Sequence, residues 1–297
     1  MCKKLLDHKI NFTLFVTVKG ANPNGDPLNG NRPRSDIDGY GFFSAECIKR
    51  KIRNRFQDEG IPILLQNPDR TYFDGCASKR LRIEKDEDAL KLMTALSKKD
   101  TKEEGNGSKK QSKSSLEREF KTLVCQKWLD VRLFGEVFAL KDFSSHVLGA
   151  VTIFSAKSLD EIDIDGIQNT KIQPAEEDSS SDTMGMRYSV PFAVYKISGS
   201  INVQPAAKNG ITEDDVIAFK KALMTLFQND ASSARPDGTM VVNRLFWWEH
   251  EAAEPKTRTD QIEDAFKIER IATENKFSDY DISWKLDECV KPEIIDF

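Results

Sequence analysis

The sequence predicts an α+β domain with the element order strand, helix, strand, strand, helix, strand (βαββαβ). An alternating apolar run over residues 11–18 indicates a half-buried first strand. Residues 45–58 and 213–228 have apolar side chains at helical spacing, and each segment follows a hydroxyl residue that can cap a helix. Apolar runs lie between and after these two helices. This order is that of a ferredoxin-like domain.

The composition is that of a globular chain with highly charged segments. The 297 residues are 39% hydrophobic and 31% charged, with a formal net charge of −4. No apolar run approaches the roughly 18 residues of a membrane span, and the first ten residues lack the apolar core of a signal peptide. The five cysteines are scattered and form no CxxC pair, which argues against a disulfide framework or a zinc site. We therefore expect a cytoplasmic protein with no membrane partner.

The first strand leads through a turn-rich loop, residues 20–34, into the first helix. Ser44 is the expected N-cap, and Glu46 places a carboxylate in the first turn, where the helix dipole favours it. The apolar stripe of this helix consists of Ala45, Ile48, Ile52 and Phe56. We expect that stripe to pack on the sheet.

The middle of the chain is less regular. Residues 61–78 are loop-like, and residues 84–98 favour a charged helix. Residues 98–115 lack aliphatic and aromatic side chains, which is typical of a mobile surface insertion. Strands are predicted over residues 128–138, 146–154 and 183–203, the last after a polar stretch at 173–182.

The last two elements of the predicted βαββαβ domain are a helix capped by Thr212 and a strand over Met240–Trp248. The segment after it, residues 251–297, is mostly acidic. Two interpretations of that segment stay open: a solvated tail, or a surface that faces the basic part of a second copy.

Basic side chains are concentrated in the first helix and the loop before it. Five cations lie within seven residues of the helix: Lys49, Arg50, Lys51, Arg53 and Arg55. The apolar stripe leaves Lys49, Arg50 and Arg53 on one flank, with Lys51 and Arg55 on another. Since few acidic partners are four residues away, a bound polyanion explains the cations better than a solvated face does.

The loop Asn22–Arg34 favours the same chemistry. Its small and turn-forming residues allow backbone amides to approach phosphates, and Arg32 and Arg34 offer bidentate hydrogen bonds. An ordinary surface loop is the alternative. The sequence GxxxxGK[ST] is absent, so this is not a nucleotide P-loop.

Groups suited to catalysis are scarce. The three histidines share no motif, and no nucleophile is paired with a base. Asp26, Asp36 and Asp38 lie near the basic segment, where they suit a hydrated Mg²⁺ or, more often, polar turns. We expect no catalytic residue, no metal and no cofactor. Met184 and Met186 flank a glycine, either as core filler or as wedges between bases.

Several of these segments together resemble the Cas-seven family of RAMP proteins, the backbone subunits of CRISPR Cascade. The similar segments are NPNGDPLNGNRPR, SAECIKRKIRN, DVRLFG and TMGMRYSVPFAVY, and residues 228–235 resemble the subtype I-C member most. The similarity spans residues 11–250 or so. One departure is Met186-Arg187, where a pair of cations is expected after TMG.

The resemblance implies an RNA-binding scaffold without enzymatic activity. It implies one RRM-like palm over residues 1–297, with a finger-type insertion at 60–125 and a thumb hairpin at 160–190. Copies would stack head to tail along the crRNA, and each thumb would displace one nucleotide. The RNA-contacting residues implied are Asn22, Asn24, Arg32, Arg34, Ser44, Lys49, Arg50, Arg53, Arg132, Met184, Met186 and Arg187.

The resemblance also implies partners. These are crRNA, target DNA, further copies of the chain, subunits of the Cas-five, Cas-eight and small Cas-eleven types, and a recruited Cas-three nuclease-helicase. Two alternatives stay open. One is a metal-dependent ribonuclease like type III backbone relatives, with Asp36 as the candidate carboxylate. The other is a general single-stranded RNA-binding protein.

Overall fold

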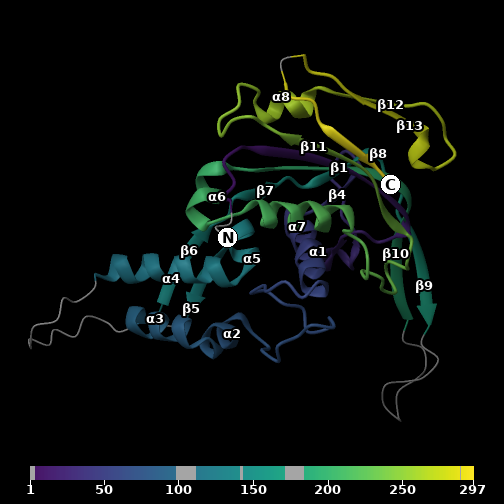
Figure 1. Cartoon of the computed structure of the whole chain (residues 1–297). Helices are drawn as coiled ribbons and strands as arrows, with labels where there is room; N and C mark the ends of the chain where they lie inside the picture. The colour runs from purple at the N-terminus through teal and green to yellow at the C-terminus, as the bar shows by residue number, and fades with distance from the viewer. Residues whose placement is uncertain (1–3, 98–111, 141–142, 171–183, 288) are drawn as a thin grey trace, which may run out of the picture.

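A large antiparallel sheet runs through the middle of the molecule (Figure 1). The computed structural model describes residues 4–97, 112–140, 143–170, 184–287 and 289–297. The strand order is β14-β11-β1-β10-β8-β4, and β7 and β9 also pair with β10. The strands are β1 (Ile10–Ala21), β4 (Tyr40–Phe43), β7 (Val151–Ile153), β8 (Ala156–Glu161), β9 (Asp165–Thr170), β10 (Met184–Ile201), β11 (Met240–Glu249) and β14 (Glu293–Asp296). The fold is therefore mixed α and β, as the sequence predicts.

Strand β1 is central, because β10 and β11 pair with it on either side. Its side chains alternate between the two faces of the sheet. Phe12 and Leu14 belong to the main core, whereas Phe15 belongs to a separate cluster on the opposite face. The predicted first strand is confirmed, and it extends to Ala21.

Two helices predicted from the sequence cover the sheet face that carries Phe12 and Leu14. Helix α1 (Ala45–Asp58) begins at the N-cap Ser44, whose Oγ accepts a hydrogen bond from the Cys47 amide. Helix α7 (Glu213–Met224) begins with a capping box between Thr212 and Asp215. A short helix, α6 (Val203–Asn209), precedes it. Both predicted helices and both predicted caps are confirmed.

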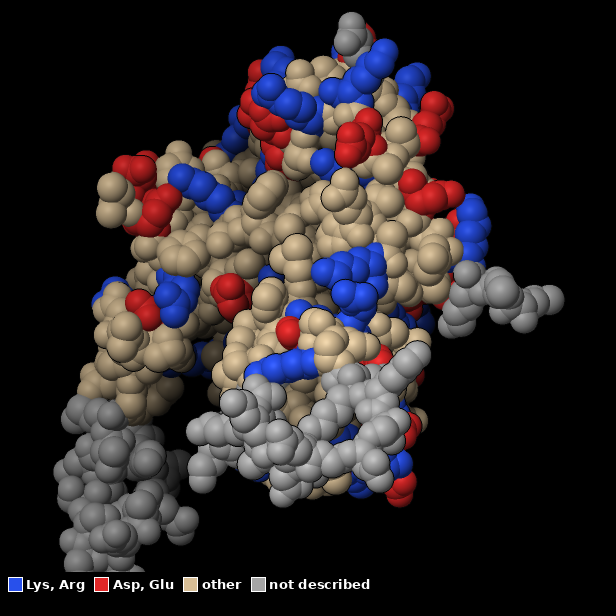
Figure 2. Space-filling view, turned by 90° about the vertical axis from the view of Figure 1, so that its left-hand side faces the viewer, with Lys and Arg blue, Asp and Glu red and all other residues tan. Residues whose placement is uncertain are grey.

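The C-terminal unit covers the opposite face (Figure 1). It consists of α8 (Thr259–Asp264), β12 (Phe266–Arg270), the 3₁₀ turn η2 (Phe277–Asp279) and β13 (Tyr280–Trp284). Phe266 and Trp284 pack against Trp248 of the sheet. The interpretation of residues 251–297 as a solvated tail is therefore wrong. The upper part of Figure 2, where this unit lies, shows blue and red side chains next to each other.

A second group of elements has its own buried cluster (Figure 1). It contains α2 (Lys79–Lys85), α3 (Glu87–Ser97), α4 (Lys113–Lys127), β5 (Gly135–Leu140) and β6 (Phe143–Leu148). Phe120 and Phe138 meet edge to face at its centre, with ring centroids 5.2 Å apart. Helix α3 is the predicted charged helix. Most of the predicted surface insertion, residues 98–111, lies outside the described residues.

The predicted strand over residues 128–138 is wrong in its first half, which is helix α5 (Leu129–Phe134). The buried Asp130 carboxylate accepts hydrogen bonds from the amides of Leu64 and Leu65. Leu133 packs into the main core, whereas Val131 packs into the second cluster. Because these positions face two cores, the segment does not alternate as a strand would.

A hairpin arm projects from one end of the sheet (Figure 1). It pairs β9 with residues 184–189 of β10, and its tip lies outside the described residues. Next to it, the loop after β1 forms a small ribbon of β2 (Gly25–Asp26) and β3 (Arg32–Pro33), joined by η1 (Pro27–Asn29). Among the described residues, no helix is long and apolar enough to cross a membrane.

Candidate nucleic-acid interface

The cations of helix α1 do not form a free basic flank. Arg53 is only 8% exposed, and its Nε donates to Asp130 Oδ2 at 3.1 Å. Its guanidinium also lies over the Phe134 ring, 5.0 Å from the centroid. The expectation of an outward-facing Arg53 is therefore wrong, since its charge is neutralised inside the fold.

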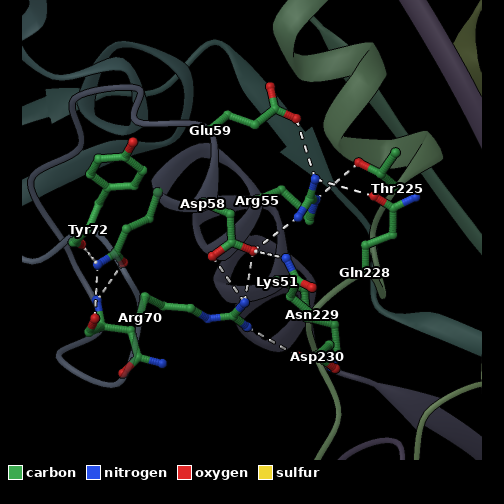
Figure 3. Close-up of polar contacts among 12 residues, drawn as sticks. Lys51, Arg55, Asp58, Glu59, Arg70, Tyr72, Thr225, Gln228, Asn229 and Asp230 are labelled. Atoms are coloured by element: carbon green, nitrogen blue, oxygen red, sulfur yellow. Dashed lines mark hydrogen bonds and ion pairs between the residues drawn. The ribbon is translucent and has the colours of Figure 1, made fainter.

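Lys51 and Arg55, on the other flank of the helix, are buried as well. Their polar contacts are drawn in Figure 3. Lys51 forms an ion pair with Asp230. Arg55 pairs with Asp58 at 3.0 Å and with Glu59 at 3.4 Å, so acidic partners are present one turn away. These cations join α1 to the rest of the protein.

Arg70 completes this group of charges. Its guanidinium lies 2.9 Å from Asp58 and 3.8 Å from Asp230, between the two carboxylates (Figure 3). Three segments that are distant in the sequence are joined in this way: α1, the loop at 67–72 and the segment 225–235. The predicted polyanion site does not extend over this half of the helix, because each cation here already has a carboxylate partner.

Lys49 differs from the other four cations of α1. Arg50 donates to the Leu65 carbonyl at 2.9 Å. Lys49 has no hydrogen bond or ion pair within the described part of the chain, and its Nζ lies 5.9 Å from the centroid of the Phe134 ring. Partial burial lowers the pKa of Lys49. An anion bound here would restore the favourable environment that the ammonium group lacks.

The asparagines of the loop build its conformation. Asn24 Oδ1 accepts a hydrogen bond from the Ser44 amide at 2.9 Å, which ties the loop to the start of α1. The Asn22 side chain is buried and donates to the Asn31 carbonyl at 2.7 Å. Ser44 itself caps the helix. These three side chains therefore position the loop, and their contact with RNA stays a prediction.

The arginines of the loop lie at the base of the arm. Arg32 is exposed, and its guanidinium lies 4.5 Å from the centroid of the Tyr188 ring of β10. Arg34 lies 3.3 Å from Asp26. Both arginines line a cavity of about 270 Å³ between the loop and Ile164, just before β9. The loop thus touches α1 at one end and the arm at the other.

One face of the arm carries large side chains. Met186 is 53% exposed and lies on the same face as Tyr188, two residues away. A Cβ atom at Gly166 would lie 3.1 Å from the Tyr188 ring and 3.5 Å from Met186 Cε, so both side chains cover this glycine. Arg187 points to the other face, opposite Ile167. The Met184 side chain lies outside what the structure describes.

Arg132, the remaining predicted contact, is partly buried and paired within the protein. Its guanidinium makes a two-pronged contact with Asp215, at 2.6 and 2.9 Å, and donates to the Cys125 carbonyl. Asp215 is also the N3 residue of the α7 capping box. The structure therefore places Arg132 as a brace between α5 and α7.

Two of the three loop aspartates, Asp26 and Asp36, have structural partners for their carboxylates. Asp36 accepts hydrogen bonds from the amides of Asp38 and Tyr40 and pairs with Lys157 at 2.9 Å. The Lys157 ammonium holds the pKa of Asp36 below its usual range. Asp26 caps η1 through the Leu28 amide. No cluster of three metal-ligating side chains is found among the described residues.

The loop and the base of the arm bring cations together with flat and apolar side chains, and the loop contacts the start of α1, the helix that carries Lys49. Lys49 and Arg32 suit phosphates, while Met186 and Tyr188 suit bases. Arg34 is already paired with Asp26. The sequence analysis did not select Tyr188. Its signal was available, because a residue two positions after Met186 in a strand shares its face.

Comparisons with known proteins identify the family of the chain. The model of the family described as CRISPR-associated protein Cas7 matches residues 8–285. A CRISPR-associated protein Cas7 from Haloferax volcanii is 42% identical over 55 residues, which are 18% of this chain and 16% of that protein. The matched part is thus about a sixth of that relative's length.

Two solved structures are similar to this chain. A chain of a CRISPR RNA-guided surveillance complex, pre-nicking, has a TM-score of 0.51 at 13% identity, covering 80% of this chain and 77% of that one. A chain of another CRISPR RNA-guided surveillance complex has a TM-score of 0.41 at 14% identity, covering 80% and 68%. The first likeness supports the fold, and the family match extends over nearly the whole sequence. The chain belongs to the Cas7 family of CRISPR-associated proteins.

Proposed function

We propose that this Cas7-family chain is a crRNA-binding backbone subunit of a type I-C Cascade complex. Several copies would lie head to tail along the spacer and present it for pairing with target DNA. The other proposed partners are the Cas-five, Cas-eight and Cas-eleven type subunits and a recruited Cas-three. The relative from Haloferax volcanii bears the name of this family, and the similar solved chains come from RNA-guided complexes.

The observation that carries the proposal is the position of the loop 22–34. It is joined to the start of α1 by Asn24 and to the arm by Arg32 stacked on Tyr188. An RNA backbone lying on this loop would therefore pass from the start of α1 to the arm, where Met186 is exposed. Such contacts to phosphate carry no sequence information, which is what a protein that holds any spacer requires.

The strand order supports a ferredoxin-like palm. Strands β11, β1, β10 and β8 are adjacent in that order, and α1 and α7 share one face. In this interpretation the hairpin arm is the thumb, and the second buried cluster belongs to the finger-type insertion. The C-terminal unit covers the sheet face on which RNA-recognition domains stack bases, so RNA is expected at the edge and the arm instead.

We also propose that the chain is not an enzyme. The ribonuclease alternative needs a loop carboxylate free to bind Mg²⁺, and Asp36 instead makes two turn hydrogen bonds and an ion pair. Incubating labelled RNA with Mg²⁺, with and without a chelator, separates the two. Metal-dependent cleavage that disappears in Asp36→Ala would overturn this part of the proposal.

Charge reversal at Lys49 tests the proposed interface. We expect Lys49→Glu to weaken binding of single-stranded RNA by at least about tenfold, because an ammonium–phosphate contact is replaced by repulsion. Fluorescence anisotropy with the full chain measures it. The matched control is Lys267→Glu on β12, an exposed lysine of the C-terminal unit with the same charge change.

The control should bind RNA as the wild type does. Equal binding by Lys49→Glu and wild type would contradict the assignment of this face. Arg53→Glu is a poor test, because it places two carboxylates together in the core and is expected to unfold the protein.

A further inference from the structure

A polar cavity of about 500 Å³ lies beside the C-terminal half of α1. Its wall comes from three segments: α1, the loop at 67–71 and the segment 229–235. Its volume falls within the roughly 300–1,000 Å³ of small-molecule sites. The cavity is separate from the predicted phosphate path, which uses the other end of the helix.

Asn54 is the residue that marks this cavity as a site. It lines the cavity and is only 6% exposed. Its Oδ1 is buried and accepts no hydrogen bond from the described part of the chain. A buried amide oxygen without a partner costs free energy, whereas a ligand that donates to it would recover that cost.

Carboxylates outnumber guanidinium groups around the cavity, whose lining includes Asp58, Asp69 and Asp230 but only Arg70 and Arg235. Arg70 lies between Asp58 and Asp230 (Figure 3). Arg235 lies 3.4 Å from Asp230. A phosphate would meet these carboxylates as well as the arginines, so an anionic ligand is disfavoured. A neutral, planar ligand fits better, since guanidinium groups stack on flat π-systems.

We propose that this cavity binds one unpaired nucleobase of the RNA, held by the amide of Asn54. The inference rests on the proposed RNA-binding function and adds a base site to it. Adenine, guanine, cytosine and uracil each present a donor and an acceptor side by side on the Watson–Crick edge. The Asn54 amide also has one donor group, the NH₂, and one acceptor, the oxygen. Rotation by 180° exchanges their positions, so the amide can match a base edge in either orientation.

A pocket for a base does not require a particular RNA sequence, so it is compatible with a protein that holds any spacer. An amide that pairs with every base edge gives affinity without selecting a sequence. The energy comes from satisfying a buried group rather than from reading a base.

The test compares two RNAs on two proteins. One RNA is a fluorescein-labelled single strand of mixed sequence, and the other has the same length with its internal bases replaced by abasic ribose. The variant Asn54→Leu keeps the side-chain size and removes the unpaired oxygen, so we expect it to fold. Asn54→Ala is the second variant, and thermal unfolding checks both.

We expect the ratio of the two dissociation constants, abasic over intact, to fall by about tenfold in Asn54→Leu relative to wild type. Lys49→Ala should weaken both RNAs equally and leave that ratio unchanged. An unchanged ratio in both Asn54 variants would overturn the inference while leaving RNA binding in place. Loss of affinity for both RNAs in equal measure would also overturn it and would point to contact with a neighbouring copy. A wild-type chain that binds neither RNA would overturn the proposed function as well.

Discussion

Lys49 and Lys51 lie two residues apart on one helix, yet the fold gives them opposite roles. Lys51 is buried against Asp230, which is 179 residues away in the sequence, whereas Lys49 forms no ion pair in the described structure and only Glu46, one turn earlier, lies near its charge. The Arg53 partner, Asp130, is 77 residues away. Spacing within the helix predicts which side chains share a flank, but not what the rest of the chain places opposite that flank. The concentration of cations was therefore predictable, and their neutralisation was not.

His250 makes stability depend on pH. It is buried, and its Nε2 contacts Asn11 Oδ1 at 2.9 Å. Burial, followed by the charge of Lys9, lowers the pKa of His250 from 6.5 to about 4. The unfolded chain therefore takes up the proton first, so the stability contributed by neutral His250 is present above pH 6.5 and is lost as the pH falls toward 4.

Urea unfolding at pH 7.5 and pH 5 measures this effect. We expect the wild type to lose up to about 1.4 kcal/mol per pH unit from this group across that range. His250→Gln, which cannot titrate, should lose less stability between the two conditions. An identical loss in both proteins would show that other groups account for it.

The helices whose N-caps are encoded by neighbouring residues could be predicted from the sequence. Ser44 and Thr212 cap the helices that follow them, and each signal lies within a few residues of the backbone groups it satisfies. Helix α5 was not predictable in this way, because Asp130 is held by amides of residues 64–65 and by Arg53. The C-terminal unit was missed for a related reason. Charged residues dominate its sequence, so the pattern does not reveal the few aromatic side chains that attach it to the sheet.

Two buried tyrosines test how the C-terminal unit is attached. The Tyr280 hydroxyl of β13 donates to Asp160 at the end of β8, which also pairs with Arg270 at 2.9 Å. The Tyr195 hydroxyl of β10 is buried with no hydrogen-bond partner in the described structure. Burial raises the pKa of both groups.

Tyr280→Phe should lower the free energy of unfolding by about 1–2 kcal/mol, because it removes a hydrogen bond to a charged acceptor. Tyr195→Phe, the matched control, should leave it unchanged or raise it by up to about 1 kcal/mol, because no bond is lost. Chemical denaturation of the two variants compares them. Equal destabilisation would contradict the assigned contacts.

In the molecule as a whole, both faces of the central sheet are packed, one against helices and the other against the C-terminal unit. In the proposed function, RNA would therefore lie on the loop, the start of α1 and the arm. Membership of the Cas7 family agrees with the resemblance that the sequence analysis drew from its segments. The order of strands in the sheet and the proposed RNA path required the structure, because they depend on which strands pair and which side chains are already paired.

Binding of full-length chain to single-stranded RNAs of two lengths, each in two unrelated sequences, tests the proposed backbone role most directly. Mass photometry counts the copies of the chain on each RNA. We expect the number of copies to rise in proportion to RNA length and to be the same for both sequences at each length. A fixed number of copies, or a number that changes with sequence at constant length, would contradict the proposal.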